Sequence, residues 1–93
     1  MTTVAIVGAG SIARRHARAC AEVAEADLVA VCDERPEAAD TLAAEFSVSR
    51  RYAGLDALLA AERLDVAIVA TWGNAHAAVT EALARSGHVR AIL

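Results

Sequence analysis

Stretches of consecutive apolar residues alternate along the chain with stretches in which apolar residues recur every three to four positions. The first pattern is typical of strands buried on both faces, and the second of helices that connect such strands. Strands are predicted at residues 3–7, 28–32, 50–52 and 66–70, with a fifth beginning near Val89. The chain is therefore predicted to be α/β, a Rossmann-type doubly wound parallel sheet of about five strands with helices on both faces.

The helices between these strands carry recognisable end signals. Pro36 suits the first position of the second helix, where a missing N–H costs nothing, and Gly54 is a permissible N-cap of the third. The fourth helix should end at Ser86 and Gly87 through a left-handed C-cap. The residues expected to face the core are Ile12, His16, Ala19, Cys20 and Val23 on the first helix, Ala39, Leu42, Ala43 and Phe46 on the second, Leu55, Leu58 and Leu59 on the third, and Ala75, Val79, Ala82 and Leu83 on the fourth.

Composition and charge narrow the classes of protein. The 93 residues are 57% apolar but only 3% aromatic, which suits one small domain with helices packed closely on a sheet. The net charge is −3 and the nine basic residues are scattered arginines, so no nucleic-acid partner is expected. A signal peptide or membrane span is not predicted either, so we expect a cytoplasmic protein. Cys20 and Cys32 lack metal-ligand spacing and are expected to be reduced, buried thiols.

A glycine-rich turn follows the first strand and opens the first helix. Gly8 allows a tight turn, and Gly10 lacks a side chain that would keep a pyrophosphate away from the backbone. The amides of Ser11 and Ile12, with the positive end of the helix dipole, would bind that anion. Ala13 takes the place of the third glycine, an accepted variant, so the loop reads as the GxGxxA form of the dinucleotide-binding fingerprint.

The acid expected of this fingerprint is Asp33, twenty residues beyond Ala13 at the end of the second strand. Its carboxylate can accept hydrogen bonds from both ribose hydroxyls of adenosine, and its charge would repel a 2′-phosphate. NAD is therefore favoured as the cofactor. NADP stays open because Arg35 could reach a 2′-phosphate or cover the adenine. Arg35 could equally be a solvated residue before a helix.

From Val4 to Leu93 the chain resembles the N-terminal half of the Gfo/Idh/MocA oxidoreductases, which act largely on sugars, inositols and related polyols. The resemblance rests on the glycine loop with His16 shortly after it, on the second strand ending at Asp33, and on residues 65–71 with His76 beyond. It implies that Thr71 and His76 border the nicotinamide end of the cofactor, although helix capping or packing would account for His76 equally well. Trp72 stands where the family has proline and Gly73 where it has asparagine, so Trp72 either lines that pocket or is a packing residue.

The resemblance also implies a catalytic lysine in a Glu-Lys-Pro segment and a second, C-terminal domain for substrate binding and oligomerisation. This chain contains no lysine and ends at Leu93. We therefore expect residues 1–93 to be the dinucleotide-binding domain with the second domain absent, to contain no catalytic residue, and to be inactive alone. Whether the chain is itself an enzyme is left open.

Two other functions remain as alternatives. A non-catalytic module could bind NAD(H), or pair with another protein or with itself through exposed apolar surface. A domain that binds S-adenosylmethionine would use a similar glycine loop and acid. Such domains usually carry an acidic residue just before the loop, where this chain has Ile6 and Val7.

Overall fold

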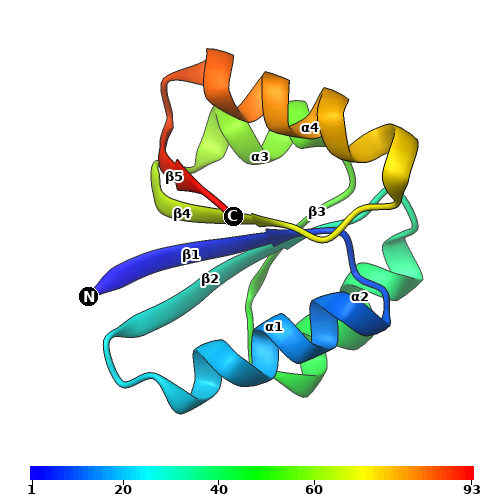
Figure 1. Ribbon diagram of the computed structural model, residues 1–93. Helices are drawn as coiled ribbons and strands as arrows, with labels where there is room; N and C mark the ends of the chain where they lie inside the picture. Colours follow the sequence, from blue (N-terminus) through cyan, green and yellow to red (C-terminus); the bar gives the residue numbers. More distant parts are fainter.

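The computed structural model describes the whole chain, Met1–Leu93, as five strands alternating with four helices (Figure 1). The strands all pair in parallel, which confirms the predicted fold class. In chain order the elements are β1 (Thr2–Val7), α1 (Ser11–Glu22), β2 (Ala26–Cys32), α2 (Pro36–Glu45), β3 (Arg50–Tyr52), α3 (Leu55–Ala61), β4 (Leu64–Val69), α4 (Gly73–Ser86) and β5 (Val89–Ile92).

The strands lie in the order β3-β2-β1-β4-β5. Figure 1 shows α1 and α2 on one face of this sheet and α3 and α4 on the other. The direction in which successive strands are added reverses at β1, so β1 and β4 flank the topological switch point. In open α/β sheets, ligands bind in the crevice beyond the carboxyl ends of the strands at this point.

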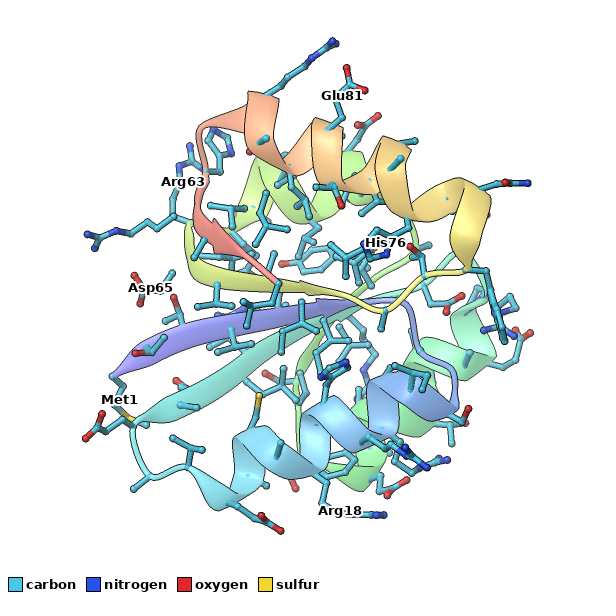
Figure 2. All side chains as sticks on the ribbon, viewed as in Figure 1. Met1, Arg18, Arg63, Asp65, His76 and Glu81 are labelled. Atoms are coloured by element: carbon cyan, nitrogen blue, oxygen red, sulfur yellow. The ribbon has the colours of Figure 1, made fainter.

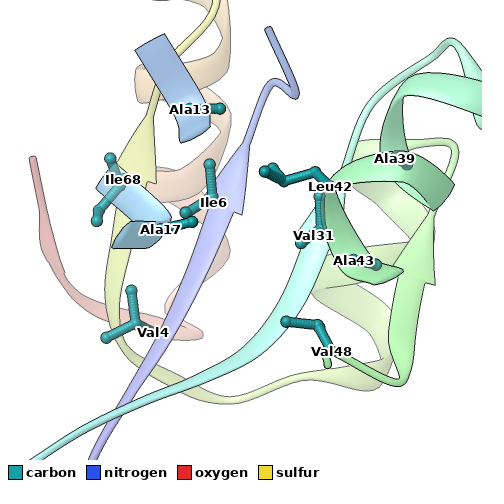
Figure 3. Close-up of a cluster of buried hydrophobic side chains, with 10 residues drawn as sticks. All are labelled: Val4, Ile6, Ala13, Ala17, Val31, Ala39, Leu42, Ala43, Val48 and Ile68. Carbon is teal, nitrogen blue, oxygen red and sulfur yellow. The ribbon is translucent and has the colours of Figure 1, made fainter. Parts of the chain in front are cut away.

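The helix α1 packs on the sheet through alanines. Ala13 and Ala17 are fully buried, whereas Ile12 and Val23 are each 52% exposed. The prediction that Ile12, Ala19 and Val23 face the core is therefore wrong, because two alanines four residues apart let the helix approach the sheet closely. The buried cluster on this face consists of Val4, Ile6, Ala13, Ala17, Val31, Ala39, Leu42, Ala43, Val48 and Ile68 (Figure 3).

Other core predictions have mixed outcomes. The predicted face of α2 is confirmed, as are Leu58 and Leu59 of α3. On α4 only Leu83 is buried and Ala75 is exposed, so the first turns of this helix stand clear of the core. His16 and Cys20, which were expected to be buried, are only partly buried, whereas Cys32 is buried as expected.

The expected helix ends are observed. Pro36 is the first residue of α2, Gly54 is the N-cap of α3, and Gly87 has a left-handed backbone with φ 72° after α4. The strands β2 and β4 each begin two residues before the predicted start, at Ala26 and Leu64. None of the helices is long and apolar enough to cross a membrane.

The register of the central strands determines which residues meet at the carboxyl edge. Val7 at the end of β1 pairs with Cys32 of β2 on one side and with Val69 of β4 on the other. A register shift in the β1–β2 pair, between Val4 and Ala5, precedes this alignment. The segments that follow these three strands therefore leave the sheet side by side, as the right-hand side of Figure 1 shows.

Candidate functional site

The turn after β1 depends on a glycine at position 8. Gly8 has φ +105°, a conformation that residues with side chains rarely adopt. A Cβ atom there would lie 2.6 Å from the carbonyl oxygen of Ala70, which follows β4. The Gly8 N–H also donates to the Cys32 carbonyl at 2.7 Å. Only glycine fits this crossing of backbone segments.

Gly10 differs from Gly8, because nothing in the chain requires it. Its backbone is extended (φ −86°, ψ −163°), and a Cβ atom would meet no other atom within 4 Å. Gly10 is the N-cap of α1, and no side chain caps this helix. The first-turn N–H groups, including those of Ser11 and Ile12, therefore face an open space at the positive end of the helix dipole.

Asp33 lies beside this loop and is bound to it. Its Oδ2 accepts a hydrogen bond from the Ala9 N–H at 2.8 Å, and its Oδ1 accepts one from the Arg35 N–H at 2.8 Å. Burial raises the pKa of the carboxyl, but the hydrogen bonds from Arg35 and Ala9 outweigh that effect, so the pKa is lowered overall. Asp33 is thus a carboxylate at neutral pH.

The side chain of Arg35 forms an ion pair with the Asp33 carboxylate. Its Nε donates to Asp33 Oδ1 and its Nη2 to Asp33 Oδ2, both at 3.2 Å. The side chain is 60% exposed, whereas that of Asp33 is 10% exposed. This ion pair is a third arrangement, distinct from the two that the sequence left open.

Two adjoining cavities surround the glycine loop. The larger, of about 410 Å³, extends toward β2 and β3 and is lined by residues that include Asp33, Arg35, Ala53 and Leu55. The smaller, of about 260 Å³, lies toward the start of α4 and includes Ser11, Ile12 and His76. Both cavities are lined by Gly10, Ala70, Thr71 and Trp72, which join them into one crevice at the switch point.

Thr71, Trp72 and His76 lie at the β4 side of this crevice. The Thr71 hydroxyl oxygen is buried and has no hydrogen-bond partner, whereas most buried polar atoms in proteins have one. Trp72 is 83% exposed, so it is not a core packing residue. His76 is exposed in the first turn of α4, and Figure 2 shows it away from Met1 and Asp65 at the other end of the sheet.

Sequence reasoning missed some residues of the crevice. No role was predicted for Ala9, yet its N–H donates a hydrogen bond to Asp33. Ala53 and Leu55 line the larger cavity because β3 lies next to β2, and the position of β3 was available from the predicted topology. Glu34 also lines this cavity, and its place beside Asp33 was the only signal.

The arrangement has the properties that a dinucleotide needs. Uncapped amides and an open Gly10 leave room for a pyrophosphate, a largely buried carboxylate lies on one side, and an unpaired hydroxyl lies on the other. No group of three or more acidic, histidine or cysteine side chains is placed to hold a metal ion. Fold and site together define a dinucleotide-binding Rossmann domain.

Comparison with known proteins identifies the family. Residues 2–93 match the model of the Gfo/Idh/MocA oxidoreductase family, NAD-binding Rossmann fold. The chain belongs to this family and is its NAD-binding Rossmann domain, as the sequence predicted. This assignment favours NAD as cofactor and does not favour a domain that binds S-adenosylmethionine.

Individual relatives agree with the assignment. The chain is 38% identical over 82 residues to inositol 2-dehydrogenase of Rhizobium meliloti (strain 1021), covering 88% of this chain and 24% of the relative. It is 32% identical over 83 residues to D-apiose dehydrogenase of Paraburkholderia graminis, covering 89% and 22%. The crystal structure of an oxidoreductase from Agrobacterium radiobacter with NAD+, L-tartaric acid and magnesium superposes with a TM-score of 0.89 at 30% identity, covering 97% and 26%. The chain thus spans about a quarter of the length of these relatives.

Proposed function

We propose that this chain holds the dinucleotide in an NAD-dependent oxidoreductase that acts on a sugar, an inositol or a related polyol by hydride transfer. Inositol 2-dehydrogenase and D-apiose dehydrogenase, which are similar to it, support this substrate class. Bound NAD would supply the hydride acceptor. The chain has no lysine, and its share of the work is to bind and orient the cofactor rather than to transfer protons to or from a substrate.

Each part of the crevice has a proposed role. Gly8 shapes the turn, while Gly10 and the amides of Ser11 and Ile12 receive the pyrophosphate. Asp33 accepts hydrogen bonds from the adenosine ribose, and Arg35 adjoins it on the same side. The nicotinamide end lies toward β4, where the Thr71 hydroxyl gains the partner that it lacks in the free chain, and where Trp72 and His76 line the smaller cavity.

The observation that carries the proposal is the open space at Gly10. Gly10 is required by no neighbouring atom, begins a helix without a side-chain cap, and lines both cavities of the crevice, so a ligand there can approach the backbone closely. Gly54 provides a matched control, because it is also an extended N-cap glycine with open space at its Cβ position.

The test compares NADH binding to the wild-type chain, Gly10→Ala and Gly54→Ala by fluorescence titration. We expect Gly10→Ala to weaken binding about tenfold or more, because one methyl group displaces the pyrophosphate from its amide donors, each worth about 1.5–3 kcal/mol with a charged partner. Gly54→Ala should leave the dissociation constant unchanged. Equal binding by Gly10→Ala and wild type, with both folded by circular dichroism, would contradict the proposed phosphate site.

Location and self-association belong to the same proposal. We expect the protein to work in the cytoplasm, and its two free cysteines are compatible with a reducing compartment. Exposed apolar side chains at Ile12, Trp72 and Leu93 are candidates for contact with another domain or a second copy. Sedimentation of the chain at increasing concentration tests the second possibility, and a monomer throughout would exclude it.

A further inference from the structure

The carboxylate of Asp33 has no acceptor position to spare. An ionised carboxylate offers about four lone-pair positions on its two oxygens. Two of them accept backbone N–H groups, from Ala9 on Oδ2 and from Arg35 on Oδ1. The other two accept the Arg35 side chain, through Nε on Oδ1 and Nη2 on Oδ2.

Two of these four donors are fixed and two are not. The Ala9 and Arg35 N–H groups belong to the backbone segments that follow β1 and β2, and each bond is 2.8 Å long. The guanidinium bonds are 3.2 Å long, at the weak end of the usual range, and the side chain that makes them is 60% exposed. The Arg35 side chain can therefore leave Asp33 without disturbing the fold.

An adenosine ribose presents two neighbouring hydroxyls, and the guanidinium occupies two acceptor positions on the Asp33 carboxylate. We propose that the Arg35 side chain occupies the place of the adenosine ribose on Asp33, and that it must move away when the dinucleotide binds. This inference rests on the proposed function. It makes Arg35 a competitor that lowers the affinity for NAD(H), rather than a contact that the affinity depends on.

The size of the effect follows from the kind of ion pair. Only the Arg35 side of this pair is exposed to solvent; solvent-screened pairs are worth about 0.2–1 kcal/mol, so removal of the guanidinium should tighten ligand binding by up to about fivefold. Arg35→Gln is therefore expected to lower the NADH dissociation constant about two- to fivefold. Arg85→Gln is the matched control, because Arg85 pairs with Glu81 on the exposed surface of α4 and the same net charge is lost.

A double-mutant cycle isolates the competition. NADH titrations are run on wild type, Arg35→Gln, Asp33→Asn and the double variant, with circular dichroism as the check of folding. Tightening by Arg35→Gln should occur only where Asp33 is present, because the asparagine no longer holds the guanidinium as an ion pair. Equal or weaker binding by Arg35→Gln, or tightening in both backgrounds, would overturn the inference.

A measurement on the unaltered chain gives a second readout. In ¹⁵N-labelled protein the Nε–H signal of Arg35 should move when NADH is added to saturation, because its hydrogen bond to Asp33 is broken, whereas that of Arg85 should not. A stationary Arg35 signal in a chain that binds NADH overturns the inference and leaves the proposed function standing. Absence of NADH binding by the wild-type chain overturns the proposed function itself.

Discussion

The backbone N–H of Ala9 donates a hydrogen bond to Asp33 Oδ2 at 2.8 Å. This bond joins the glycine loop after β1 to the acid after β2, twenty-four positions apart in the sequence. The loop and the carboxylate are therefore held in one arrangement before any ligand arrives, which lowers the entropy cost of binding.

Stability should depend on the charge of Asp33 in acid. Because its pKa is lowered in the folded chain, the ionised form stabilises the fold fully above the unfolded value, which is about 4, and this contribution is lost as the pH falls through the folded value. Asp33→Asn should be less stable than wild type at pH 7, and the difference should shrink below pH 4. Urea unfolding at pH 7 and pH 3 measures this. If wild type and Asp33→Asn differed in free energy of unfolding by the same amount at both pH values, the ionisation of Asp33 would not contribute to stability.

Cofactor choice should also depend on Asp33. The Asp33 carboxylate repels the 2′-phosphate of NADP and accepts hydrogen bonds from both ribose hydroxyls of NAD, so Asp33→Asn weakens both effects. We expect NADH binding to weaken about tenfold or more and the preference for NADH over NADPH to fall by a larger factor. Parallel titrations with the two cofactors measure both. Arg51→Gln, which alters an ion pair with Asp40 on the surface, should change neither the NADH affinity nor the preference for NADH over NADPH.

The parts of the fold that the sequence predicted well are those set by local chemistry. Buried apolar runs that alternate with helical patterns predict a parallel sheet, and Pro36 and Gly87 mark helix ends because of their own backbone preferences. The predicted face of α1 is partly wrong, because apolar residues occur on more than one face of this helix and their spacing does not show which face packs on the sheet. Close packing of α1 on the sheet instead favours the small side chains of Ala13 and Ala17.

In the site, the sequence identified which residues gather but not how they pair. Gly8, Gly10 and Asp33 follow from spacing, because the ends of β1 and β2 meet at one edge. The Arg35 ion pair depends on a rotamer, and the unpaired Thr71 hydroxyl depends on what surrounds it in three dimensions. The spacing of residues along the chain determines neither property, so neither could be predicted from the sequence.

Gly8→Ala should destabilise the fold. The new Cβ would lie 2.6 Å from the Ala70 carbonyl oxygen, and the residue would keep a positive φ of +105°. Backbone strain of this kind costs about 1–3 kcal/mol, and the clash between backbone segments adds to it. We expect a loss of about 3 kcal/mol or more in the free energy of unfolding, measured by urea titration. Gly10→Ala, which meets no neighbouring atom, should lose less than about 1 kcal/mol, and equal losses would contradict the distinction.

A buried acid outside the crevice holds the edge strand β3. Glu62 is 6% exposed, and its carboxylate accepts hydrogen bonds from Arg50 Nε at 2.7 Å and from the Tyr52 hydroxyl at 2.6 Å. The bond to Glu62 raises the pKa of Tyr52. Glu62→Gln should lower the free energy of unfolding by about 1–3 kcal/mol, because a charged acceptor is lost in a buried place. Glu81→Gln, at an exposed pair, should cost less than about 0.5 kcal/mol.

The Glu62 cluster also bears on the crevice. The strand β3 leads directly to Ala53 and Leu55, which line the larger cavity. If Glu62 positions this strand, Glu62→Gln should weaken NADH binding modestly, by about two- to threefold, while hydrogen exchange in residues 50–52 becomes faster. Unchanged exchange in that strand would show that backbone pairing with β2 suffices to hold it.

The thiol of Cys32 should be unreactive although it borders the crevice. Burial, with smaller contributions from the charges of Asp33 and Glu34, raises its pKa to about 11. At pH 8 the reactive thiolate is then a few hundred times scarcer than for a free cysteine of pKa about 8.5. In a Cys20→Ser variant, which leaves Cys32 as the single thiol, a disulfide reagent should react about 100-fold or more slowly with the folded chain than with the chain in denaturant. A folded chain that reacts as fast as the unfolded one would mean that the end of β2 opens readily, and that the carboxylate next to it is not held as the structure shows.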